Sequence, residues 1–85
     1  MLTTNEVVEK VNGVLTEELK VNVEELRPEA RIAEDLGADS LQRVALVMQL
    51  EESFGLKIPD EDAETLTTVQ AVIEYVQKHL NNQQE

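Results

Sequence analysis

Apolar residues recur at spacings of three and four in three separate stretches of this chain, and this period most restricts its fold. Such spacing places side chains on one face of a helix, so each stretch predicts an amphipathic helix. The expected helices span about residues 5–19, 40–54 and 68–80, and a short one runs from Pro59 to about Thr65. A long loop joins the first two. The sequence therefore predicts an all-α fold, a small four-helix bundle.

Residues that start and stop helices mark the ends of these segments. Thr3 with Glu6, and Thr67 with Gln70, have the spacing of a capping box before the first and last helices. Gly55 is placed to end the helix over residues 40–54.

The loop over residues 20–37 is long for so small a protein, so we expect apolar anchors to tie it to the core. Four apolar residues suit this role: Val23, Leu26, Ile32 and Leu36. Pro28 opposes a continuous helix, and the sequence leaves open a short helical turn between Pro28 and Ile32.

Length and composition limit the classes of function. We expect residues 1–85 to form one domain with a frayed polar tail at residues 81–85, because a chain of 85 residues encloses only a small core. Carrying or binding is then favoured over catalysis. The chain has no cysteine, so thiol chemistry would need a prosthetic group.

The charge of the chain indicates its partners. Eighteen acidic residues against seven Lys and Arg give a formal charge of −11, which disfavours nucleic acid and anionic membranes and favours proteins with basic patches. The sequence shows no long apolar segment and no signal-peptide pattern at its N-terminus. We expect a cytoplasmic monomer that does not insert into membranes.

The start of the helix over residues 40–54 is a candidate site. Gly37 permits an unusual backbone turn, Asp39 can cap the helix, and Ser40 falls in its first turn. A hydroxyl at the positive end of a helix suits attachment of a phosphate. Taken alone, Ser40 is better explained as part of a helix cap, because Ser and Asp are common at helix starts.

The same helix has two apolar faces, and a small bundle has elements to cover only one of them. One face is expected in the core: Leu46, Val47, Leu50 and Phe54. The other is expected to dock a partner protein, with two acids at its border: Leu41, Val44, Ala45, Met48, Glu51 and Glu52.

A hydrolase is not favoured. The only histidine, His79, lies near the end of the last helix, where it complements the helix dipole. Ala38 and Gln42 occupy the glycine positions of a Gly-x-Ser-x-Gly motif around Ser40.

No specific metal site is expected either. The acidic run over residues 60–64 has Thr65 and Ala71 where a calcium-binding loop needs glycine and glutamate. A solvated helix start explains these acids.

The string Leu-Gly-Ala-Asp-Ser-Leu over residues 36–41, followed by the helix and by Phe-Gly-Leu-Lys-Ile-Pro-Asp over residues 54–60, resembles the acyl carrier proteins of dissociated fatty acid synthases. The resemblance covers nearly the whole chain. It implies that Ser40 carries 4′-phosphopantetheine from coenzyme A, with Asp39 supporting attachment, and that a growing acyl chain is held as a thioester. It also implies a non-catalytic role and three kinds of partner: a phosphopantetheinyl transferase, fatty acid synthase enzymes with basic docking patches, and acyltransferases.

The resemblance further implies that the acyl chain is sheltered between helices. Candidate pocket residues are Leu46, Val47, Leu50, Ile58, Ala63, Leu66 and Val72. The chain departs from the family pattern at Gln42, Arg43 and Ala45, where two usual acids are missing and a cation has appeared. This leaves open a specialised carrier for a polyketide or another dedicated acyl-transfer pathway. An unmodified acidic helical adaptor is the alternative from a different class.

Overall fold

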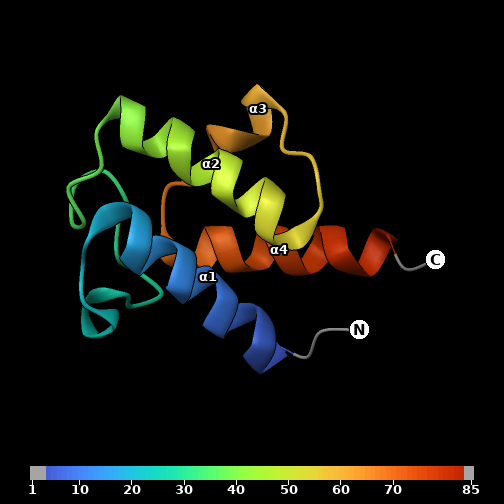
Figure 1. The fold of residues 1–85 in the computed structure, drawn as a ribbon, viewed down its shortest axis with the longest axis horizontal. Coiled ribbons are helices and arrows are strands. Elements are labelled where there is room, and N and C mark those ends of the chain that lie inside the picture. Colours follow the sequence, from blue (N-terminus) through green and yellow to red (C-terminus); the bar gives the residue numbers. More distant parts are fainter. Residues whose placement is uncertain (1–3, 84–85) are drawn as a thin grey trace.

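Four α-helices and one 3-10 helix make up the regular structure of residues 4–83, which are the residues that the computed structural model describes. They are α1 (Thr4–Leu19), η1 (Val23–Glu25), α2 (Ser40–Phe54), α3 (Asp60–Ala63) and α4 (Val69–Gln83) (Figure 1). No strand occurs among these residues. The predicted all-α bundle is confirmed.

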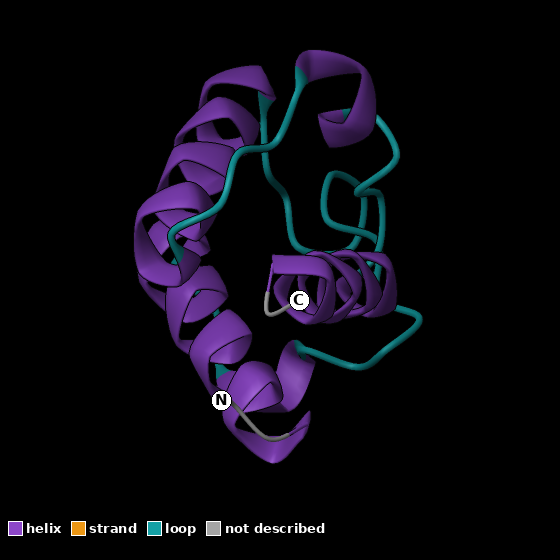
Figure 2. Ribbon diagram, turned by 90° about the vertical axis from the view of Figure 1, so that its right-hand side faces the viewer, coloured by secondary structure: helices purple, strands orange, loops and turns teal. Residues whose placement is uncertain are grey.

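Helix α1 packs against both α2 and α4. Figure 2 views α4 almost along its axis, with α1 and α2 forming a wall on one side of it. Each helix turns its apolar stripe inward, and Val11, Leu15, Leu50, Val72 and Val76 have no exposed surface. Burial of aliphatic side chains from all three helices in one cluster is the main source of stability.

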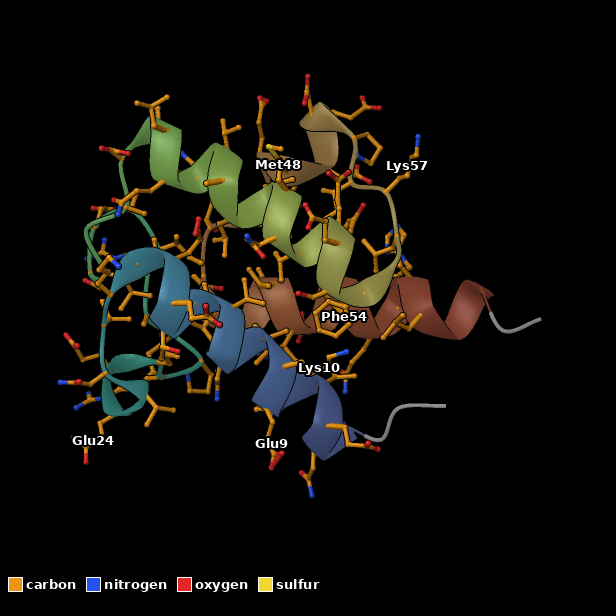
Figure 3. All side chains as sticks on the ribbon, in the orientation of Figure 1. Glu9, Lys10, Glu24, Met48, Phe54 and Lys57 are labelled. Carbon is orange, nitrogen blue, oxygen red and sulfur yellow. The ribbon has the colours of Figure 1, made fainter. Side chains whose placement is uncertain are left out.

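Lys10 fastens α1 to the end of α2. Its Nζ donates a hydrogen bond to the carbonyl of Ser53 over 3.2 Å and lies 5.4 Å from the centre of the Phe54 ring (Figure 3). An exposed cation over an aromatic face contributes about 0.5–1 kcal/mol.

Three backbone hydrogen bonds attach the long loop to the start of α4, and apolar side chains attach it to the core. Amides of Ile32, Val69 and Gln70 donate to carbonyls of Thr67, Ala30 and Pro28 over 2.9, 3.1 and 2.9 Å. Arg31 and Thr68 thereby form an isolated antiparallel bridge. The apolar anchors Leu26, Ile32 and Leu36 are buried as expected.

The fourth expected anchor, Val23, is wrong, because it begins η1 and is 58% exposed. Two alanines are buried in the loop instead, Ala30 and Ala38. The 3-10 helix also lies before Pro28 rather than between Pro28 and Ile32.

The helix boundaries differ from expectation at the ends of two helices. Helix α3 ends at Ala63, before the expected Thr65, whose amide and hydroxyl both bond to the carbonyl of Asp62. Helix α4 continues to Gln83, beyond the expected end near Leu80, and residues 81–83 contain no glycine or proline that would stop a helix. The expected Thr3 cap and residues 84–85 lie outside the described residues.

The expected cap of α4 is shifted by one residue. Thr68 Oγ1, not Thr67, accepts a hydrogen bond from the amide of Ala71 over 3.1 Å. The carbonyl of Thr67 is held by the loop amide of Ile32, and the Gln70 side chain donates to Glu74.

Candidate functional site

A capping box fixes the start of α2. Asp39 has extended backbone angles, and its Oδ1 accepts a hydrogen bond from the amide of Gln42 over 2.8 Å. The Gln42 Oε1 accepts in return from the amide of Asp39 over 3.3 Å. Gln42, which departs from the family pattern in the sequence, therefore completes this cap. Ser40 follows as the first helical residue and is exposed.

A backbone hydrogen bond and ion pairs stabilise the turn before α2. Gly37 has a φ of +73°, which side chains resist, and the amide of Ala38 bonds to the carbonyl of Ile32 over 3.1 Å. Arg31 forms ion pairs with Glu34 and Asp35 over 3.1 and 3.4 Å. Hydrogen bonds from the backbone amide and side chain of Arg31 lower the pKa of Asp35. These contacts present Ser40 on an ordered turn.

The outward face of α2 leaves large apolar side chains in water. Leu41 is 80% exposed, Val44 59% and Met48 55%. Ala45 is half-buried and Glu52 is exposed. We call Leu41, Val44, Ala45 and Met48 the outer face of α2. Figure 3 shows Met48 on α2 beside α3.

Glu51 has a structural contact that its sequence position did not indicate. It is half-buried, and its Oε2 accepts a hydrogen bond from the amide of Ile58 over 2.9 Å. One of the two expected border acids thus holds the segment between α2 and α3, whereas Glu52 faces solvent.

A cavity of about 450 Å³ lies between α2, α3 and the segments that flank α3. Five of the seven pocket residues expected from the sequence line it: Leu46, Val47, Ile58, Ala63 and Leu66. Leu50 and Val72 do not; they have no exposed surface and belong to the central cluster. Helical period predicts which side chains point inward, but it does not show whether an inward side chain packs in the core or lines a cavity.

The mouth of this cavity carries the polar groups. Ser40 and Arg43 line it from α2, together with Glu51. Asp60 lines it from the start of α3, and Glu64 lines it from the position directly after α3. Val44 and Met48 belong both to its lining and to the outer face of α2, so the cavity and this face share an edge.

A side-chain hydrogen bond joins α3 to α4. The Tyr75 hydroxyl donates to Asp62 Oδ2 over 2.8 Å, and the Tyr75 ring stacks on His79 with centroids 3.9 Å apart. Burial, then the bond to Asp62, raises the pKa of Tyr75 to about 12. His79 Nδ1 lies 3.0 Å from the carbonyl of Tyr75 and is not among the cavity residues. His79 is therefore engaged within α4.

The matching family supplies the chemistry for this site. Residues 9–76 match the family described as "Phosphopantetheine attachment site". An "Acyl carrier protein" of Thermosynechococcus vestitus is 49% identical over 75 residues, which cover 88% of this chain and 93% of that protein. This chain belongs to the acyl carrier protein family.

An acyl carrier protein is a non-catalytic carrier with covalently attached 4′-phosphopantetheine, and both predictions are thereby confirmed. Such a carrier presents its cargo to synthase and transferase enzymes. The site fits the arm, because Ser40 offers an exposed hydroxyl at the mouth of a largely aliphatic cavity. When bound, the arm supplies the thiol that a chain without cysteine lacks.

Two further features of this acyl carrier protein concern metals and membranes. Within residues 4–83, no group of three or more histidine and acidic side chains is arranged to hold a metal ion. In the same part of the chain, none of the helices has the length and apolarity needed to cross a bilayer.

Proposed function

We propose that Ser40 is the attachment residue and that this protein carries the growing acyl chain of fatty acid biosynthesis. The exposure of Ser40 beside an aliphatic cavity is the observation that carries this proposal. A phosphopantetheinyl transferase transfers the phosphopantetheinyl group of coenzyme A to Ser40 Oγ. One P–O bond forms at Ser40 Oγ as the pyrophosphate P–O bond of coenzyme A breaks, adenosine 3′,5′-bisphosphate is the leaving group, and the hydroxyl proton is released.

The chain's own residues bind and orient in this scheme. Asp39 holds the first turn of α2 so that Ser40 faces a partner enzyme, and the aliphatic lining of the cavity shelters an acyl chain from water. Leu46, Val47, Ile58, Ala63 and Leu66 supply that lining. A thioester carbon chain is apolar, so removing it from water favours its entry.

The outer face of α2 is the proposed docking surface. Its exposed apolar residues offer contact area, and the formal charge of −11 attracts enzymes with basic patches. Weak contacts of this kind allow a partner to leave after each step. The partners that fit are the transferase, the fatty acid synthase enzymes and the acyltransferases.

Intact-mass measurement after incubation with coenzyme A and a phosphopantetheinyl transferase tests the attachment residue. Wild type should gain one phosphopantetheine, and Ser40→Ala should gain none. The chain has only one other serine, Ser53, so Ser53→Ala is the matched control and should be modified like wild type. Modification of Ser40→Ala would assign the arm to another residue.

A specialised carrier for another acyl-transfer pathway is the second candidate, favoured by Arg43 and Ala45 at positions where the family usually has other residues. If fatty acid synthase enzymes read an acid at residue 45, Ala45→Glu should strengthen binding to one such enzyme, and more at low salt than at high salt. The exposed Ala33 permits the matched control Ala33→Glu, which should leave affinity nearly unchanged. Equal affinity of wild type and Ala45→Glu at every salt concentration would show that Ala45 does not tune partner choice.

A further inference from the structure

Arg43 is a cation at a place where the structure supplies it with no partner. Its half-buried side chain lines the same cavity as Ser40, and the two residues lie three apart on α2. At this spacing their Cβ atoms are about 5–6 Å apart. Within the described residues, both ion pairs belong to Arg31, and the Arg43 side chain makes no hydrogen bond.

Two effects act on charge at this position: the helix dipole disfavours a cation, and the neighbouring acids disfavour an anion. Arg43 lies in the first turn of α2, where the helix dipole repels positive charge. The other charged residues that line the cavity are all acids: Glu51, Asp60 and Glu64. Their carboxylates would repel a negative group placed at Ser40, and Arg43 is the one cation in the lining that can offset this repulsion.

We propose that Arg43 binds the phosphodiester that attachment creates on Ser40. This inference rests on the proposed attachment to Ser40. The guanidinium presents a planar fork of donors that matches two phosphate oxygens, so the pair is a charge-assisted hydrogen bond rather than simple attraction. The new anion at the helix start also removes the unfavourable interaction between Arg43 and the dipole.

This contact would set the direction in which the arm leaves Ser40. Arg43 belongs to the cavity side of α2, so its hold on the phosphodiester draws the start of the arm toward the cavity mouth and away from the solvent side of the helix. Arg43 thereby acts as a positioning residue for the arm. It touches neither the thiol nor the acyl group.

Side-chain NMR tests the contact directly. The protein has three arginines, Arg27, Arg31 and Arg43, so their Nε–H signals in a protein labelled with ¹⁵N are few, and the Arg43 signal is assigned by its loss in Arg43→Gln. Conversion of apo to holo protein should shift the Arg43 signal and leave the Arg27 signal in place. About 1 M NaCl should reduce the shift, because the Debye length is then about 3 Å.

A melting measurement provides the second readout, with complete conversion checked by intact mass for every variant. At low salt, attachment should raise the melting temperature of wild type relative to its own apo form, and this gain should be lost in Arg43→Gln. Arg27→Gln is the matched control, since it removes an exposed arginine that does not line the cavity and should keep the gain. Arg43→Lys should keep only part of it, because a point charge lacks the fork.

The outcomes separate this inference from the one on which it rests. If no mass is gained at Ser40, the attachment residue is wrong. If Ser40 is modified but the Arg43 signal does not move and Arg43→Gln keeps the full gain in melting temperature, the contact with the phosphodiester is refuted and Ser40 stands. A shift of the Arg43 signal on Asp60→Asn or Glu64→Gln in the apo form, with none on attachment, would show that Arg43 pairs with one of these acids and not with the phosphodiester.

Discussion

Helices α1 and α4 use their apolar residues differently from α2 and α3. The stripes of α1 and α4 meet in a closed core, where Leu15 and Val76 have no exposed surface. Helices α2 and α3 instead enclose a cavity, and α2 leaves Leu41 80% exposed. Residues of one chemical kind thus stabilise the fold on the closed side and are left available for binding on the open side.

The largest expected effect is the loss of stability when a leucine is shortened to alanine, and this loss should differ between the closed side and the open side. Leu15→Ala on the closed side should reduce the free energy of unfolding by about 3–5 kcal/mol, because it leaves a new void among fully buried neighbours. Leu46→Ala should cost about 2–3 kcal/mol, because Leu46 already borders a cavity. Urea denaturation measures both. Equal losses would mean that the cavity side is packed as tightly as the core.

The next largest effect on stability is expected from loss of the Asp39 cap of α2. Asp39→Ala should reduce the free energy of unfolding by about 1 kcal/mol and slow attachment at Ser40, because the amide of Gln42 loses its acceptor. Asp39→Asn keeps a capping oxygen and should recover most of that stability. Denaturation and the rate of mass gain give the two readouts. A destabilised Asp39→Asn would show that charge, not capping, is what Asp39 contributes.

The hydrogen bond from Tyr75 to Asp62 joins the two sides, and Tyr75→Phe should cost about 0.5–1.5 kcal/mol. The pKa of Tyr75 is raised to about 12, above its ordinary value of 10.0, so the folded state holds the hydroxyl proton more tightly. This stabilisation is fully present below about pH 10 and is lost as the pH rises from about 10 to about 12.

The difference in melting temperature between wild type and Tyr75→Phe should therefore narrow over that alkaline range. A comparison of the two proteins cancels the titration of the lysines, which they share. A constant difference from pH 8 to pH 12 would contradict a role for the Tyr75 proton.

The smallest effect on stability should come from the outer face of α2. Met48→Asp should change the free energy of unfolding by less than about 0.5 kcal/mol, since the side chain is 55% exposed, yet weaken binding to a partner enzyme. Val23→Asp is the matched control, because Val23 is 58% exposed on η1. If both variants weaken binding equally, added negative charge rather than the outer face is responsible.

The sequence alone predicts the structure correctly where the contacts that determine it are local. The range Ser40–Phe54 was predicted correctly, because Asp39 caps its own helix and Gly55 ends it with a φ of +63°. The outer face also followed from period alone: Leu41, Val44 and Met48 are the exposed apolar residues of this helix.

The sequence alone does not predict features that depend on contacts between residues far apart in the chain. Thr67 and Thr68 are chemically alike, and only the bond from Ile32 to the carbonyl of Thr67 makes Thr68 the cap. Period likewise could not show that Leu50 is in the core while Val47 lines a cavity, because that depends on where α3 lies. Gln42 had a detectable signal, since it follows Asp39 at the spacing of a capping box.

The attachment of the loop to the start of α4 also bears on how the chain reaches its fold. The residues that Ile32, Val69 and Gln70 join are far apart in the sequence, so these bonds can form only after a large part of the chain has closed on itself. Helical proteins usually fold fast because their contacts are local, whereas the bonds between the loop and the start of α4 are non-local contacts. Its amides should therefore gain protection from hydrogen exchange later than those inside α1, and the turn that orients Ser40 should be among the last parts of the molecule to become ordered during refolding.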